Sequence, residues 1–198
     1  MSLALALTLV RIALSPLFLV LYLYYPSLHI SLTMLPVLLL GIMVIAEISD
    51  LLDGHLARKN NQVTELGKLL DPMADSIFRI SVFLTFTQGL VQLPLLLVFV
   101  FFYRDSIIST LRTLCALRGV ALAARTSGKI KAVIQAVTAF FILIALIFHA
   151  QGLISLEELQ NISFYSALTA AIYTVYSGVE YITANYLYIK KALARSQG

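Results

Sequence analysis

The chain has 198 residues, of which 60% are hydrophobic and 12% are charged, and its mean hydropathy is +0.93. Soluble domains contain about 45–50% apolar residues, so this composition excludes an ordinary soluble protein and predicts an integral membrane protein. The net charge of +4 is not accompanied by a module that interleaves basic and aromatic residues, so we expect no nucleic-acid partner.

Six apolar segments follow one another along the chain, each of about 20 residues and therefore long enough to cross a bilayer core roughly 30 Å thick. They cover residues 3–25, 32–58, 67–87, 94–117, 131–149 and 163–189. No Lys or Arg precedes the first apolar run and no small-residue cleavage site follows it, so we expect a retained helix rather than a signal peptide. The sequence predicts an all-α integral membrane protein, a single domain over residues 1–198. Its six transmembrane helices are expected to form a bundle with a polar active-site cavity open to the cytoplasmic side.

Positive charge is distributed unevenly over the predicted connections between these segments. The connections at residues 26–32, 88–93 and 151–162 contain no Lys or Arg. The opposite side holds Arg58, Lys59, Lys68, Arg118, Arg125, Lys129, Lys131, Lys190, Lys191 and Arg195. Because Lys and Arg accumulate in cytoplasmic loops, both termini are predicted to be cytoplasmic, in what we expect to be a bacterial inner membrane.

The stretch from Asp50 to Asp75 places four aspartates in an otherwise apolar sequence. Asp50 and Asp53 are three residues apart, and Asp71 and Asp75 are four apart, so each pair projects from one face of a helix. The short polar connection between the two halves is expected to fold them back antiparallel, which brings the four carboxylates together. Bare carboxylates repel one another at such range, so this arrangement predicts protonation or the binding of hard divalent cations.

The residues around the aspartates indicate which metal ions and which reaction this stretch suits. Without a Cys or His cluster in this stretch, Mg²⁺ or Mn²⁺ is favoured over Zn²⁺. Gly54 allows a ligand or a helix to approach the backbone closely, and Arg58 is placed to meet an anion. A metal cluster beside an arginine suits phosphoryl transfer. The alternative is a membrane protein whose helix ends carry solvated charges.

Further polar residues occur on the predicted membrane helices. Asp71, Asp75 and Arg79 recur four residues apart and predict an inward-facing stripe, and the fourth segment and the start of the fifth hold Arg104, Asp105, Ser109, Arg112, Gly128, Lys129 and Lys131. Asp105, Ser109 and Arg112 predict a second inward-facing stripe. Arg104 lies deep in its segment and needs a partner such as Asp105 or a water-filled cavity. These cations either snorkel to the membrane surface or form a basic pocket for an anionic group beside the aspartates.

The pattern D-x2-D-G-x2-A-R-x8-G-x3-D-x3-D resembles the signature of the CDP-alcohol phosphotransferases. The chain matches it at Asp50, Asp53, Gly54, Ala57, Arg58, Gly67, Asp71 and Asp75. Within this family, the R-D-x3-S-x2-R stretch, the G-K-x-K element and Thr8-x2-Arg11 resemble phosphatidylglycerophosphate synthases. The chain departs from that pattern at Leu5, which replaces an Asn, at Glu47, which replaces a neutral residue, and at Ser76, where a Lys is frequent.

The resemblance implies the transfer of a phosphatidyl group from CDP-diacylglycerol to an alcohol, with glycerol 3-phosphate as the expected acceptor and CMP as the leaving group. It also implies two Mg²⁺ or Mn²⁺ ions, contact with membrane lipid and a homodimer. Other acceptors, namely inositol phosphate, inositol or serine, stay open. So does a different class of protein, because buried carboxylates also occur in membrane transporters.

The resemblance further assigns roles to residues. Asp75 is the expected general base. The metal ligands are Asp50, Asp53, Asp71 and Asp75, and the CDP-binding residues are Asp50, Gly54, Ala57, Arg58 and Gly67. The residues expected to hold an acceptor phosphate are Arg104, Arg112 and Lys131.

Overall fold

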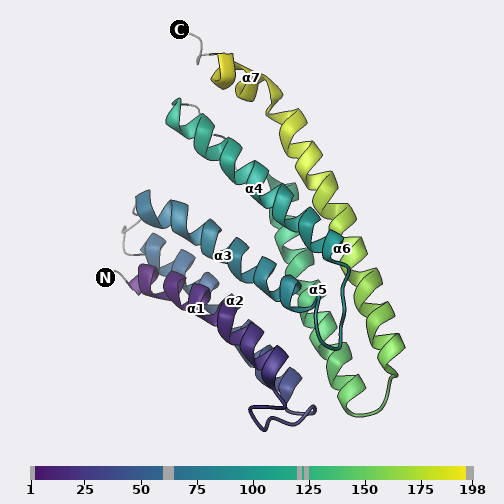
Figure 1. The fold of residues 1–198 in the computed structure, drawn as a ribbon. Coiled ribbons are helices and arrows are strands. Elements are labelled where there is room, and N and C mark those ends of the chain that lie inside the picture. The colour runs from purple at the N-terminus through teal and green to yellow at the C-terminus, as the bar shows by residue number, and fades with distance from the viewer. Residues whose placement is uncertain (1–2, 60–64, 120–121, 123–124, 195–198) are drawn as a thin grey trace.

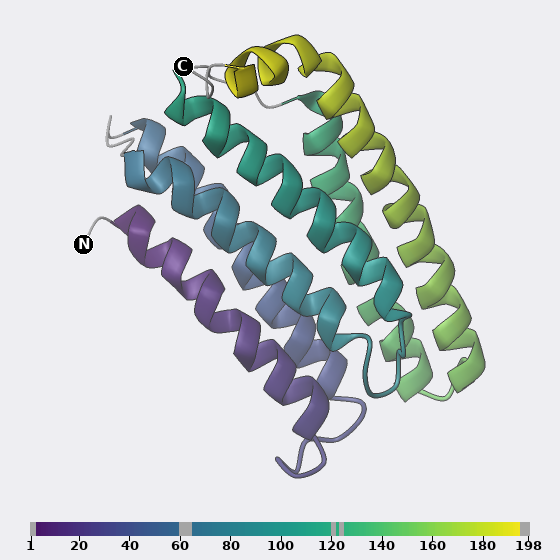
Figure 2. The same cartoon turned by 45° about the horizontal axis from the view of Figure 1, so that its top comes forward.

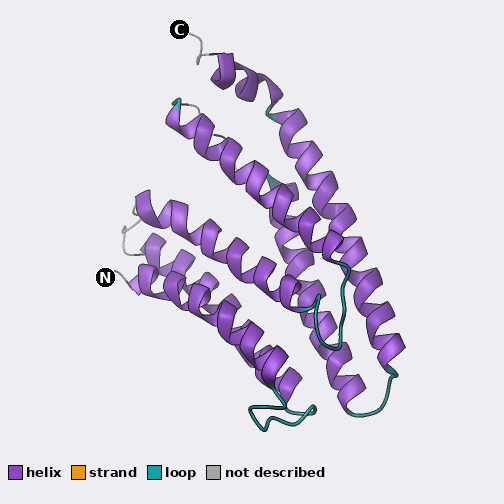
Figure 3. Ribbon diagram, viewed as in Figure 1, coloured by secondary structure: helices purple, strands orange, loops and turns teal. Residues whose placement is uncertain are grey.

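The structure, a computed structural model, describes the backbone of residues 3–59, 65–119, 122 and 125–194, and the side chains of residues 8–49, 73–119, 122 and 125–190. The described residues form α-helices and no strand (Figures 1 and 3). The helices are α1 Leu3–Tyr24, α2 Leu35–Lys59, α3 Glu65–Thr85, α4 Leu95–Leu117, α5 Thr126–Ala150, α6 Leu156–Ala184 and α7 Tyr186–Ala194. The all-helical class predicted from the sequence is therefore confirmed.

The described part of the chain contains seven helices, one more than the six predicted transmembrane segments. The difference lies in the last predicted segment, residues 163–189, which is divided at Asn185. The Asn185 side-chain amide donates to the Tyr181 carbonyl oxygen at 2.8 Å, and the Asn185 backbone N–H donates to the same oxygen at 3.2 Å. An asparagine that bonds the backbone in this way competes with continued helix, so α6 ends there and α7 starts in a new direction.

The helices pack as two groups that meet in the middle of the bundle (Figure 2). In one group α1 packs against α2 and α3, and in the other α6 packs against α4 and α5; contacts of α3 with α4 and of α2 and α3 with α5 join the groups. Helices α1 to α6 alternate in direction (Figure 1). The start of α1, the end of α2, the start of α3 and α7 consequently lie at one end of the bundle.

The two ends of the bundle differ in charge. The connections at the far end, residues 25–34, 86–94 and 151–155, contain no Lys or Arg. The near end has Arg118 and Arg125 at the boundaries of α4 and α5, together with Lys129 and Lys190. The Lys and Arg residues that are unevenly distributed along the sequence thus lie at one end of the folded bundle.

A set of polar side chains is buried within the largely apolar interior of the bundle, and large apolar side chains also cover its outer surface. The buried polar residues of α5 and α6 are Lys131, Gln135, Thr138, Ser163, Thr174 and Ser177. Exposed side chains on the same and neighbouring helices include Leu96, Val133, Phe141, Ile172 and Val175. A soluble protein rarely exposes so many large apolar side chains, so this outer surface suits hydrocarbon better than water.

Helix α5 is the one helix in the described part of the chain that is long and apolar enough to cross a membrane on length and composition alone. Shorter apolar stretches occupy Thr8–Tyr24 of α1 and Leu35–Ser49 of α2. The structure is thus consistent with a membrane protein, and the six crossings and the cytoplasmic cavity stay predictions.

A buried aromatic corner closes the far end of the bundle. The Phe86 ring packs edge-on against the rings of Phe18 and Tyr22, with centroids 5.8 Å apart in each pair. The Tyr22 hydroxyl accepts from the Val91 backbone N–H at 3.0 Å and donates to the Gln88 carbonyl oxygen at 3.2 Å. Tyr22 therefore fastens α1 to the turn between α3 and α4.

We predict that Tyr22→Phe destabilises the fold. The variant keeps the ring but leaves the buried Val91 N–H without a partner, which costs about 1–3 kcal/mol in the free energy of unfolding. The midpoint of thermal unfolding in detergent micelles should fall accordingly. Tyr24→Phe is the matched control, because the Tyr24 side chain is exposed. Equal midpoints for the two variants would contradict the role given to the Tyr22 hydroxyl.

Candidate active site

The aspartates of the sequence motif lie on two antiparallel helices. Asp50 and Asp53 belong to the C-terminal half of α2, and Asp71 and Asp75 belong to the N-terminal half of α3. Both stretches lie at the same end of the bundle (Figure 1). The side chains of Asp50, Asp53, Gly54, Ala57, Arg58, Gly67 and Asp71 lie outside the described set. The backbone thus confirms the predicted helical hairpin, and the convergence of the four carboxylates stays a prediction.

Asp75 is the motif carboxylate whose side chain is described. It is half-buried and forms an ion pair with Arg79, four residues further along α3. The pairing confirms that Asp75 and Arg79 share one face of the helix, as their spacing predicts. The guanidinium compensates the charge of the carboxylate and fixes its orientation.

The next residue, Ser76, connects α3 to α4. The Ser76 hydroxyl donates to Oδ2 of Asp105 at 3.3 Å. Ser76, which follows Asp75 at the end of the motif, therefore contacts the group of charged residues that contains Asp105. The two groups form one continuous polar region at the centre of the bundle.

Asp105 holds two cations. Lys131 Nζ of α5 donates to both carboxylate oxygens at 2.8 Å, and Arg104 Nη1 donates to Oδ1 at 3.0 Å. The side chains of Lys131, Asp105 and Arg104 are 5%, 11% and 13% exposed, so the charges are largely removed from solvent. The pairing of Arg104 with Asp105 confirms the partner predicted from the sequence.

The polar region carries an excess of positive charge among the described side chains. The charges of Arg79 and Arg104 both act on Lys131, while Asp75 and Asp105 provide the negative charge. Three cations next to two carboxylates form a centre that favours an additional anion.

Arg104 also reaches the sixth helix, which the sequence interpretation did not include in the site. Its Nη2 donates to the Ser177 hydroxyl of α6 at 2.8 Å, and Ser177 is completely buried. Ser177 is one of several small residues in an apolar helix and carries no motif, so no signal in a single sequence distinguishes it. A second pair of contacts joins the end of α6 to α5, because Glu180 accepts from Arg125 Nε and from the Ser127 hydroxyl, each at 2.6 Å.

Arg112, the third predicted acceptor residue, is not part of this cluster. It is exposed on α4, about 12 Å along the helix axis from Arg104. Ser109 is exposed as well, so the predicted stripe of Asp105, Ser109 and Arg112 is not buried beyond Asp105. The last turns of α4 pack Ile108 and Cys115 against Tyr181 and Ile189, and Arg112 lies one turn from Ile108, where its charge acts on Tyr181.

The first helix contributes a fully buried cation at the same end of the bundle. Arg11 is 1% exposed and Thr8, one turn earlier, is equally buried. Both belong to the Thr8-x2-Arg11 element that resembles the family's opening. A guanidinium buried to this extent must be compensated, so α1 is part of the polar interior and not only a lipid-facing wall.

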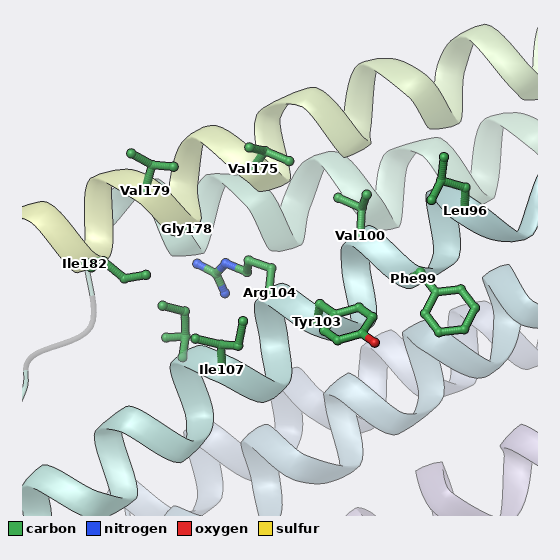
Figure 4. A pocket seen from close by; sticks show the side chains of 11 residues that line it. Leu96, Phe99, Val100, Tyr103, Arg104, Ile107, Val175, Gly178, Val179 and Ile182 are labelled. Carbon is green, nitrogen blue, oxygen red and sulfur yellow. The ribbon is translucent and has the colours of Figure 1, made fainter.

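An apolar groove of about 560 Å³ lies between α4 and α6 on the other side of Arg104 (Figure 4). Its walls include Leu96, Phe99, Val175, Val179 and Ile182. The groove differs from the predicted polar cavity, because its lining is aliphatic and aromatic apart from Arg104 and the hydroxyl of Tyr103. Arg104 consequently separates an apolar groove from the polar centre.

Comparisons with known proteins show which family the chain resembles. A family model described as CDP-alcohol phosphatidyltransferase matches residues 1–176. The CDP-diacylglycerol–glycerol-3-phosphate 3-phosphatidyltransferase of Bacillus subtilis (strain 168) is 33% identical over 191 residues, which cover 92% of this chain and 94% of the relative. The protein of the same name from Rickettsia bellii is 33% identical over 138 residues, or 68% and 72% of the two chains. The CMP-forming cardiolipin synthase of Streptomyces coelicolor is 39% identical over 67 residues, or 34% and 31%.

We predict that Asp105→Asn strongly destabilises the protein. Removing one partner of a buried ion pair leaves uncompensated charge, which costs roughly 3–5 kcal/mol in the free energy of unfolding. The midpoint of denaturation in micelles should fall for Asp105→Asn and recover partly when Lys131→Met is added. Glu157→Gln, at an exposed position, is the control. A single variant as stable as the control would show that Asp105 does not compensate the two cations.

Proposed function

Because the chain belongs to the CDP-alcohol phosphatidyltransferase family, we propose that it transfers the phosphatidyl group of CDP-diacylglycerol to glycerol 3-phosphate. The products are phosphatidylglycerophosphate and CMP. The names of the relatives that match most of this chain support this pair of substrates. The cardiolipin synthase supports another acceptor less well, since it matches about a third of the chain.

The observation that carries the choice of acceptor is the cationic cluster around Asp105. An acceptor with its own phosphate needs cations near the reacting phosphoryl group, whereas inositol or serine does not bring a phosphate. Arg104 and Lys131 are joined through a single carboxylate, and Ser76 links that carboxylate to the residue next to Asp75. The cluster therefore contacts Ser76, the residue that follows the proposed base along the chain.

The four motif aspartates fit a divalent metal by the chemistry of their donors. Asp50, Asp53, Asp71 and Asp75 offer only carboxylate oxygens, which hard cations such as Mg²⁺ and Mn²⁺ prefer. We propose that they hold two such ions. When bound, the ions neutralise charge on the pyrophosphate of CDP-diacylglycerol.

The residues of the chain have separate tasks in the proposed reaction. Gly54, Ala57 and Gly67 leave room for the cytidine nucleotide, and Arg58 contacts its phosphate. Asp75 accepts the proton of the acceptor hydroxyl, and the resulting oxygen attacks the phosphorus that bears the diacylglycerol. The bond from that phosphorus to the oxygen of the CMP phosphate breaks, and CMP leaves with the electron pair.

The ion pair with Arg79 orients Asp75 for its proposed role as general base. It restrains the carboxylate to one orientation on α3, next to Ser76 and its contact to Asp105. A base held in this way can receive a proton from a hydroxyl whose phosphate is bound at Arg104 and Lys131. Positioning both ends of the acceptor reduces the entropic cost of reaching the transition state.

The proposed orientation in the membrane places both termini and the aspartates on the cytoplasmic side of a bacterial inner membrane, with six crossings. The support is the charge difference between the two ends of the bundle and the apolar outer surface. The proposed homodimer rests on the family resemblance alone.

The test is CMP release from CDP-diacylglycerol by purified protein, with each acceptor supplied separately. We predict activity with glycerol 3-phosphate that requires Mg²⁺ or Mn²⁺ and stops on chelation, and none with inositol 1-phosphate, inositol or serine. Activity with another acceptor alone would keep the reaction class and overturn the acceptor. Folded protein that is inactive with every acceptor would contradict the proposal and favour a transporter.

We predict that Asp75→Asn abolishes turnover, because an amide cannot accept the proton of the acceptor hydroxyl. Binding of the cytidine nucleotide should persist, since the other motif residues are unchanged. Turnover is measured by CMP release and nucleotide binding by calorimetry on the same preparation. A variant with activity close to that of the wild type would remove Asp75 from the role of base.

We propose that Arg112 contacts the acceptor phosphate from the end of α4, outside the cluster around Asp105. Arg112→Ala should then raise the KM for glycerol 3-phosphate by about tenfold, the loss expected for a hydrogen bond to a charged group. The KM for CDP-diacylglycerol should not change. Lys190→Ala is the matched control, because Lys190 is an exposed cation on α7 at the same end of the bundle. Equal KM values in the two variants would assign Arg112 to the surface and leave acceptor binding to Arg104 and Lys131.

A further inference from the structure

The side chain of Arg104 crosses from α4 to α6 and is held at both edges of its guanidinium. One edge bonds the Asp105 carboxylate through Nη1, and the other bonds the Ser177 hydroxyl through Nη2. Ser177 is completely buried, so its hydroxyl cannot exchange this partner for bulk water. The two bonds together define the plane of the guanidinium.

Two glycines make room for this side chain. A Cβ atom at position 178 of α6 would lie 3.1 Å from Cγ of Arg104, and one at position 128 of α5 would lie 3.3 Å from its Nη2. Figure 4 shows the guanidinium beside α6 at Gly178. A methyl group at either position would press on the arginine, at its stem or at its charged end. Gly128 and Gly178 therefore form a cradle in which Arg104 has one position.

The guanidinium keeps unused donors in this cradle. Its Nε is buried and has no hydrogen-bond partner among the described residues. An arginine presents its donors in a planar fork that matches a phosphate, so an oriented fork with a spare donor can bind a phosphate oxygen. A buried donor without a partner is costly unless a ligand completes it.

We infer that Ser177 and Gly178 of α6, together with Gly128 of α5, are positioning residues that orient Arg104 toward the phosphate of the acceptor. The inference rests on the proposed function and extends its acceptor site to a sixth helix. Ser177 and Gly178 lie just beyond residue 176, where the match to the family model ends. Binding of the acceptor in this chain then depends on α6, a helix that contains no residue of the motif from Asp50 to Asp75.

Kinetics of Ser177→Ala and Gly178→Ala test the inference, with Val179→Ala as the control on the apolar groove. Each of the first two variants should raise the KM for glycerol 3-phosphate about tenfold and leave the KM for CDP-diacylglycerol unchanged. Val179→Ala should behave like the wild type, since its side chain is exposed on the other side of Arg104. A purely structural role would lower the folded fraction and the apparent rate with both substrates instead.

A double-variant cycle shows whether Ser177 affects the binding of glycerol 3-phosphate through Arg104 or by a contact of its own. In an Arg104→Met background, Ser177→Ala should change the KM for glycerol 3-phosphate no further, because the group that it orients is gone. Additive effects, or an unchanged KM in the single variants, would overturn the inference. Wild-type protein that is inactive with glycerol 3-phosphate would instead overturn the proposed function, so the two failures are distinguishable.

Discussion

The placement of Asp105 between two buried cations is the interaction on which the rest of the structure depends. Its carboxylate receives Lys131 from α5, Arg104 from its own helix and Ser76 from α3, and Arg104 extends the connection to α6. Three helices from both halves of the bundle thus meet at one carboxylate, and a fourth is joined to it through Arg104. Such a group is costly to bury unless its partners are all present, so the contacts that stabilise the fold also arrange the charges for an anionic acceptor.

The apolar exterior and the polar interior follow from the same physical constraint. Hydrocarbon cannot solvate a charge, so a chain that needs aspartates, arginines and lysines for phosphoryl chemistry must turn them toward one another. Arg11 and Lys131 are almost completely buried, while leucine, valine and phenylalanine side chains cover the outside. The groove between α4 and α6 meets the buried polar cluster at Arg104, which lines the groove and bonds Asp105.

The sequence was sufficient for the features that depend on local spacing, and insufficient for those that depend on packing. Periodicity predicted the helices and the shared face of Asp75 and Arg79, because residues three or four apart on a helix lie on one face. The cost of a charge deep in an apolar segment predicted the partner of Arg104. It did not predict the break at Asn185 or the exposure of Ser109 and Arg112, since both depend on what the ends of α4 and α6 pack against. Ser177 and Gly178 could not be identified, because small residues in a membrane helix have many reasons to occur.

The most direct test of the central claim follows one oxygen atom through the reaction. Glycerol 3-phosphate labelled with ¹⁸O at its primary hydroxyl is incubated with CDP-diacylglycerol and the purified protein, and both products are analysed by mass spectrometry. The account predicts that phosphatidylglycerophosphate carries the label and that CMP does not, because the acceptor oxygen attacks the phosphorus of the phosphatidyl group. Label in CMP, or unlabelled lipid product, would contradict it.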